Sequence, residues 1–166
     1  MNKAEIIINL KSTTGQFQTA TFLNEEQLYA TTNGKWSVAE NLEHLILSVK
    51  PVNLALSLPK FALLFFGKAN RPAKNYDEVV TYYQSKLQAG AKATKDYIPA
   101  KQRNKGELLQ DFSLKHETLI NKLEGWSESD LDKYFLPHPI LGKLSVREIL
   151  FFTIYHINHH YKTIQH

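Results

Sequence analysis

The segment GKWSVAENLEHLILSVK, residues 34–50, contains the strongest structural signal in the chain. Ser37 and Glu40 have the spacing of a capping box, in which each side chain accepts a hydrogen bond from the backbone amide of the other residue. Apolar residues then recur every three or four positions, as on the buried face of a helix; they are Val38, Leu42, Leu45, Ile46 and Val49. The segment therefore predicts an amphipathic helix that begins at Ser37 and reaches at least Lys50.

The rest of the chain also shows a helical pattern. Periodic apolar residues predict helices over residues 3–20, 76–97 and 104–124. A second capping box, formed by Ser145 and Glu148, predicts a last helix that runs to the end of the chain. Since no stretch alternates between apolar and polar residues over a useful length, the predicted fold class is all-α.

The segments between these helices are predicted to be turns and loops. Residues 24–28 indicate a single capped turn, and residues 67–75, which contain Pro72, indicate a loop. Residues 126–144 predict a short turn followed by a loop. Pro51 either kinks the helix that contains it or opens a new segment through Phe66.

Two of the predicted helix starts resemble each other in sequence. Residues 34–40 read GKWSVAE and residues 142–148 read GKLSVRE, so both follow the pattern Gly-Lys-apolar-Ser-Val-x-Glu. The chemistry that begins a helix favours such residues wherever a helix starts. We therefore interpret the similarity as two independent capping boxes and do not predict an internal repeat.

The composition is that of one globular domain, which we expect to span residues 1–166. Hydrophobic residues make up 43% of the chain and charged residues 22%. The absence of cysteine excludes disulfides, thiolate metal sites and a cysteine nucleophile. The net charge of +4 is spread along the chain and no nucleic-acid-binding module is recognisable, so no nucleic-acid partner is expected.

The sequence also indicates where the protein acts. The N-terminal segment MNKAEIIINL contains Glu5 and lacks an obvious cleavage site, so we interpret it as the start of a helix and not as a signal peptide. The longest apolar stretch, residues 54–66, is shorter than the roughly 20 residues that span a bilayer. We therefore expect a cytoplasmic protein without a membrane partner.

Three histidines near the C-terminus predict a metal site. His156 and His160 are four residues apart, so both rings lie on one face of a helix and can reach one cation. The pair His156 and His159 is also sterically feasible. At about 100° per residue, His160 lies roughly 40° from the centre of the buried face, His156 roughly 80° and His159 roughly 140°. His159 thus points mostly outward, and His156 and His160 are the predicted ligands.

A third ligand has to come from another helix, because two histidines give only a weak site. His44, two turns into the helix that begins at Ser37, is the best candidate, although it lies on the flank of that helix's apolar stripe. We assign no functional role to His116, His138 or His166, and interpret His138 as a loop residue. Glu40, Asn41, Tyr155 and Asn158 are candidates for hydrogen bonds to the ring N–H groups of the ligands, and Trp36 is predicted to be a packing residue.

Three parts of the chain together resemble the DinB/YfiT-like superfamily of metalloproteins. They are residues 34–45, residues 138–145 with the sequence HPILGKLS, and residues 156–160 with the sequence HINHH. The resemblance extends from about residue 23 to residue 164. It implies an up-down four-helix bundle with His44, His156 and His160 as metal ligands at one end. It also implies a homodimer, and it places an extra helical segment, residues 51–97, between the second and third core helices.

The resemblance implies that the protein binds a divalent metal ion, and Zn or Ni is predicted first and Fe or Mn next. It suggests several functions for such a protein. Some relatives are S-transferases or isomerases that use low-molecular-weight thiols, so the leading hypothesis is thiol transfer to a small electrophile. Because the chain lacks cysteine, the thiol would be a cosubstrate. The alternatives are a hydrolase that uses water activated by the metal, and a non-catalytic stress-related bundle whose apolar residues 54–66 form a dimer surface.

Overall fold

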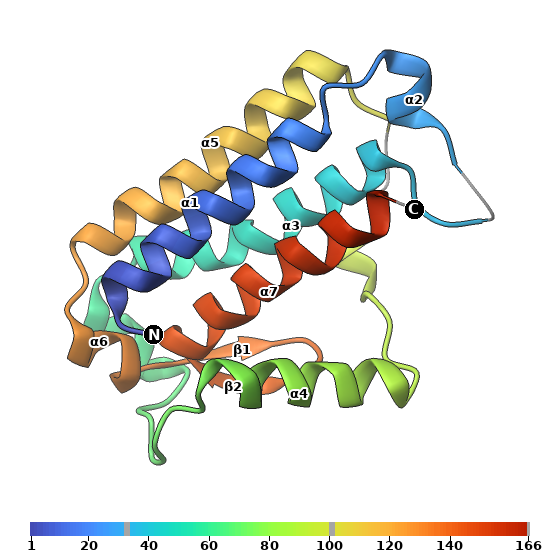
Figure 1. The fold of residues 1–166 in the computed structure, drawn as a ribbon. Coiled ribbons are helices and arrows are strands. Elements are labelled where there is room, and N and C mark those ends of the chain that lie inside the picture. The colour runs from blue at the N-terminus through green and yellow to red at the C-terminus, as the bar shows by residue number, and fades with distance from the viewer. Residues whose placement is uncertain (32–33, 100–101, 166) are drawn as a thin grey trace.

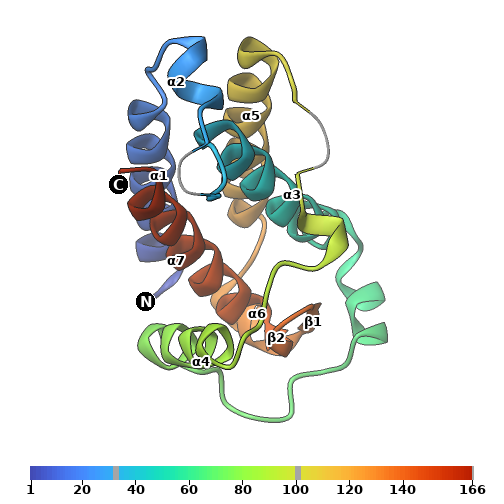
Figure 2. The ribbon, with the colours of Figure 1, turned by 90° about the vertical axis from the view of Figure 1, so that its right-hand side faces the viewer.

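Four long helices form the body of the protein in a computed structural model that describes residues 1–31, 34–99 and 102–165. They are α1 (Lys3–Ala20), α3 (Val38–Ser57), α5 (Lys105–Glu124) and α7 (Val146–Ile164). α1 packs against α5 and α7, and α3 packs against the same two helices, so the four enclose one core. Figure 2 shows α1 and α7 on one side of this bundle and α3 and α5 on the other. The predicted all-α four-helix bundle is confirmed.

Each long helix begins directly after a residue whose side chain caps the first helical turn. The side chains of Asn2, Ser37 and Ser145 each accept a hydrogen bond from the backbone amide of a glutamate three residues on. The side chain of that glutamate in turn accepts a hydrogen bond from the backbone amide of the capping residue. Asn104 caps α5 through the amides of Gly106 and Glu107. The predicted helix over residues 3–20 is confirmed, and that over 104–124 is confirmed with Asn104 as its cap. The predicted turn near residue 24 is the short helix α2 (Glu25–Tyr29).

The helices run up, down, down and up along the chain, and so do not alternate in direction as the up-down order implied by the resemblance would require. α3 and α5 are parallel, because Arg103 contacts Glu43 near their starts and Lys122 contacts Asn53 near their ends. α1 and α7 are parallel as well, since Arg147 contacts the Met1 carbonyl at one end and Tyr161 lies near Phe17 at the other. The start of α3 therefore lies beside the end of α7, as Figure 1 shows.

The long connection between α3 and α5 contains the predicted extra helical segment. α3 continues through Pro51 to Ser57, and the connection then forms two 3₁₀ turns, η1 (Lys60–Phe65) and η2 (Lys95–Tyr97), with helix α4 (Tyr76–Gln88) between them. α4 packs against α7. The predicted helix over residues 76–97 ends early, because Gly90 adopts a left-handed conformation with φ +88°. The chain then turns back, so that η2 lies against α3.

The prediction of a loop over residues 126–144 was wrong in part. After the short helix α6 (Glu128–Lys133), strands β1 (Phe135–His138) and β2 (Gly142–Ser145) form an antiparallel hairpin. The strands are too short to show alternation, and the turn that joins them depends on Gly142, whose φ is +73°. The hairpin leads directly into the cap of α7. It places His138 next to the bundle.

No helix within the described ranges is both long enough and apolar enough to cross a membrane.

Candidate metal centre

His44, His156 and His160 meet where the start of α3 lies beside the end of α7. Nε2 of His156 lies 3.1 Å from Nε2 of His44 and 3.1 Å from Nε2 of His160. One ring nitrogen of each residue lies within 4.8 Å of the other two, and all three side chains are buried. The structure thus brings the three predicted ligands together, while the binding of a metal stays a prediction.

Hydrogen bonds that involve Nδ1 show that Nε2 is unprotonated in two of these histidines. Nδ1 of His44 lies 2.6 Å from the Tyr97 carbonyl oxygen, which can only accept, so Nδ1 carries the proton. Nδ1 of His160 lies 2.6 Å from Oδ1 of Asn41. The Asn41 amide nitrogen donates to the carbonyls of Trp36 and Ser37, which fixes Oδ1 as the acceptor. Both histidines therefore present an unprotonated Nε2 toward His156.

Burial keeps the three rings neutral. Desolvation lowers the pKa of His44, although the Tyr97 carbonyl opposes this shift. Desolvation and the neighbouring histidines lower the pKa values of His156 and His160 well below the usual value. Neutral imidazole is the form that binds metal ions, so little protonation competes with binding near neutral pH.

Aromatic rings hold the histidines in place. The Trp36 ring lies 4.9 Å from the His44 ring and is stacked at 6.3 Å on the His160 ring, measured between centroids. Phe152 is stacked at 4.8 Å on His156. Trp36 is thus the predicted packing residue, and the residues it packs against are two of the candidate ligands. These contacts restrict ring rotation, which favours a preorganised site.

The arrangement fits a divalent metal ion held by His44, His156 and His160. Metal–nitrogen bonds of about 2.0–2.1 Å in a tetrahedral site place the nitrogen atoms about 3.3–3.4 Å apart. The observed separation of 3.1 Å from His156 to each partner is close to this value. Three neutral nitrogen ligands leave coordination positions open, as in catalytic sites.

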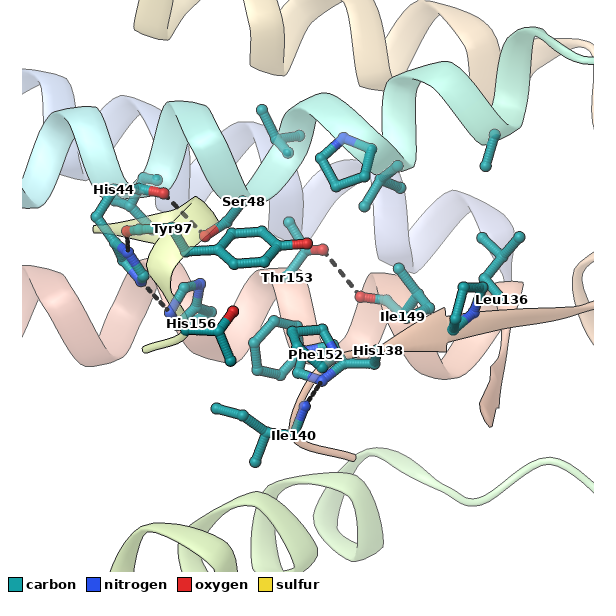
Figure 3. Close-up of a pocket in the computed structure, with 18 of the residues that line it drawn as sticks. His44, Ser48, Tyr97, Leu136, His138, Ile140, Ile149, Phe152, Thr153 and His156 are labelled. Atoms are coloured by element: carbon teal, nitrogen blue, oxygen red, sulfur yellow. Dashed lines mark hydrogen bonds between the residues drawn. The ribbon is translucent and has the colours of Figure 1, made fainter. Parts of the chain in front are cut away.

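A cavity of about 230 Å³ extends from His44 and His156 into the molecule. Figure 3 shows these two histidines at one end of the cavity, with Tyr97 reaching across it and His138 and Phe152 beside each other. Its walls are mainly apolar side chains of α3, α7 and the hairpin, and none of the described lining residues is Asp, Glu, Lys or Arg. The cavity therefore suits a small, uncharged and largely apolar molecule.

Sequence reasoning missed several residues of this cavity. Tyr97 comes from η2, and its carbonyl orients His44, a role that no side-chain pattern could reveal. His116 and His138 both line the cavity, although no role was predicted for them. His138 lies within the family-like segment HPILGKLS, which was the one available signal. His166 lies outside the described residues.

Only one of the predicted supporting residues contacts a ligand in the described structure. Asn41 binds His160, whereas Glu40 binds the Ser37 amide as the capping box requires. The Tyr155 hydroxyl accepts a hydrogen bond from Gln84 instead, and the Asn158 side chain makes no hydrogen bond to a described residue. His159 is half-buried and is not part of the three-histidine group, in line with its predicted direction.

Comparisons with known proteins identify the family of the chain and a similar fold. The sequence model of the DinB superfamily matches residues 16–164. The structure is similar to that of YfiT from Bacillus subtilis, with a TM-score of 0.64 and 17% sequence identity over 98% of this chain and 83% of YfiT. YfiT is described as a probable metal-dependent hydrolase with an unusual four-helix bundle topology. No curated protein sequence matches the chain significantly.

Proposed function

The chain belongs to the DinB superfamily, and from this premise we propose that it is a divalent-metal-dependent hydrolase of small, largely apolar molecules. The observation that carries the proposal is that His44, His156 and His160 converge, and that His44 and His156 line one end of an apolar cavity. The description of YfiT as a probable metal-dependent hydrolase supports the same reaction class.

The chemistry divides between a metal ion and the residues of the chain. His44, His156 and His160 would hold the divalent metal ion, which would supply Lewis-acid chemistry and would lower the pKa of a bound water or thiol. The chain keeps the imidazoles neutral by burial and holds two of them in the required tautomer through Tyr97 and Asn41. The apolar walls would bind the substrate next to the rings of His44 and His156.

Thiol transfer is the second candidate function, and the same donor set favours it. The three ligands are neutral, so no described ligand offsets the charge of a divalent ion, and the site favours an anionic nucleophile such as hydroxide or a thiolate. Low-molecular-weight thiols, however, usually bear charged groups. Since the described cavity lining offers these groups no charged partner, we place hydrolysis first.

The decisive experiment combines metal analysis with two assays. Protein purified without a polyhistidine tag should contain stoichiometric metal, and His44→Ala, His156→Ala and His160→Ala should each abolish it. His159→Ala is the matched control and should retain the metal. Neutral esters and amides should turn over in thiol-free buffer. Turnover only when a thiol and an electrophile are both present would replace hydrolysis with transfer, and equal metal content in all variants would refute the site.

A non-catalytic bundle that acts as a homodimer is the remaining alternative. Exposed apolar side chains in and before η1 support a dimer surface: Phe65 is 97% exposed, Phe61 74% and Leu54 65%. Light scattering of the wild type and of the double variant Phe61→Ser, Phe65→Ser tests this surface. A dimer that the double variant converts to a monomer, together with no turnover by metal-loaded protein, would favour the non-catalytic role.

A further inference from the structure

His138 is the cavity residue whose hydrogen bonds are most informative. Its Nδ1 lies 3.1 Å from the backbone amide nitrogens of both Ile140 and Leu141, in the turn of the hairpin. Both amides can only donate, so Nδ1 is unprotonated and accepts from both. In a neutral ring the proton therefore resides on Nε2.

Nε2 of His138 is available to a bound molecule. It lies on the far side of the ring from the turn amides and has no hydrogen-bond partner among the described residues, and His138 is one of the residues that line the cavity. The ring lies edge-on to Phe152 at 4.3 Å and lines the cavity, as Figure 3 shows. Burial lowers the pKa of His138 to about 4, so the ring is neutral near neutral pH.

We propose that His138 is a specificity-determining residue whose Nε2–H donates a hydrogen bond to an acceptor oxygen, such as a carbonyl, of a small apolar molecule in the cavity. This inference rests on the proposed function in that it takes the cavity as the substrate site, and it narrows the substrate class to neutral carbonyl compounds. A neutral donor suits an uncharged acceptor in an apolar cavity, because it orients the oxygen without adding a charge that would need solvation.

His116 provides an internal contrast in the same cavity. Its Nδ1 lies 2.8 Å from the Phe112 carbonyl, so Nδ1 donates and Nε2 is an acceptor. Burial lowers its pKa to about 4 as well. The two histidines are thus both neutral but have opposite tautomers, and only His138 can donate to a carbonyl.

The test compares two probes of nearly equal shape, acetophenone and α-methylstyrene, which differ by C=O against C=CH₂. Their affinities are measured for the full-length protein before and after chelation of metal. In His138→Asn, Oδ1 can replace Nδ1 as acceptor for the turn amides, while the Nε2–H is lost. The preference for acetophenone should fall roughly 3- to 10-fold in His138→Asn, and it should be unchanged in the control His116→Asn.

Proton–nitrogen correlation spectra provide a second readout. The wild type should show the Nε2–H tautomer for His138 and the Nδ1–H tautomer for His116, and acetophenone alone should shift the Nε2 proton of His138. Thermal unfolding verifies that each variant is folded. The proposal is overturned if neither probe binds, if His138→Asn keeps the wild-type preference, or if His138 shows the Nδ1–H tautomer. Because the affinities are also measured on chelated protein, the result for His138 can be interpreted even if the three histidines bind no metal.

Discussion

The two helices that bear the candidate ligands begin with almost the same sequence but in different surroundings. In GKWSVAE and GKLSVRE the first glycine has φ +71° and +73°, respectively. In both, the serine amide donates to the glutamate at 2.7 Å and the glutamate amide donates to the serine hydroxyl at 3.2 Å. The local sequence thus produces the same cap twice.

The glutamates of the two caps differ in what else they bind. Glu40 is half-buried and makes no further side-chain hydrogen bond to a described residue. Glu148 is fully buried and accepts two hydrogen bonds from Arg71, at 2.5 and 2.8 Å, and one from the Lys74 amide at 2.6 Å. The start of α7 therefore anchors the connection that precedes α4. The difference shows that a cap is a local property, whereas its contribution to stability depends on distant residues.

Replacing the glutamate of each cap should produce the largest difference between the two helix starts in the free energy of unfolding. We expect Glu148→Ala to lower the free energy of unfolding by about 3 kcal/mol, the lower end for a broken buried ion pair, because Arg71 is partly exposed. Glu40→Ala should cost about 1 kcal/mol, because it removes one hydrogen bond, the one that the Ser37 amide donates to Glu40. Urea unfolding measures both values. Equal losses would contradict the distinction between a buried network and a simple cap.

The start of α3 should matter for metal affinity instead. Asn41, in the first turns of α3, orients His160, so Asn41→Ala should weaken metal binding roughly 10- to 100-fold, as for other residues that orient ligands. Competition with a chelator of known affinity measures this change. Asn41→Asp retains an acceptor for His160 and should bind metal more tightly than Asn41→Ala. A folded Glu148→Ala variant should keep wild-type affinity, and a loss there would show that the two helix starts are coupled.

The same contrast explains how far the sequence could predict this protein. Caps and apolar stripes are local, so the starts at Ser37 and Ser145 and the pairing of His156 with His160 could be predicted from spacing. His44 lay on the flank of its stripe, and the family resemblance supported its choice as the third candidate ligand. Contacts across the fold could not be predicted from spacing: the Arg71–Glu148 pair joins a loop to a helix start, and the Tyr97 carbonyl reaches His44 from η2. His138 was misread as a loop residue because a four-residue strand shows no periodicity.

Acid should weaken the start of α7 through Glu148. Burial would raise the pKa of Glu148, but the hydrogen bonds from Arg71 and from the amides of Lys74 and Ser145 outweigh it, so the pKa lies below its usual value. A carboxylate with a lowered pKa stabilises the fold above its unfolded-state pKa of about 4.3, and this contribution is lost as the pH falls through the folded-state value. Urea unfolding from pH 6 to pH 3 should therefore show a steeper loss for the wild type than for Glu148→Gln. Parallel curves would refute the linkage.

The smallest effect should come from the serines, and here the two starts should agree. Ser37→Ala and Ser145→Ala each remove the acceptor for one otherwise unpaired amide of the first helical turn, so each should cost about 1 kcal/mol by urea unfolding. Neither change touches Arg71 or the histidine rings, and metal content should stay at the wild-type level in both. A cost at Ser145 well above that at Ser37 would mean that its hydroxyl also positions Glu148 for Arg71. The cap and the buried ion pair would then be one cooperative unit at the start of α7, and the cap there would no longer be a purely local structure.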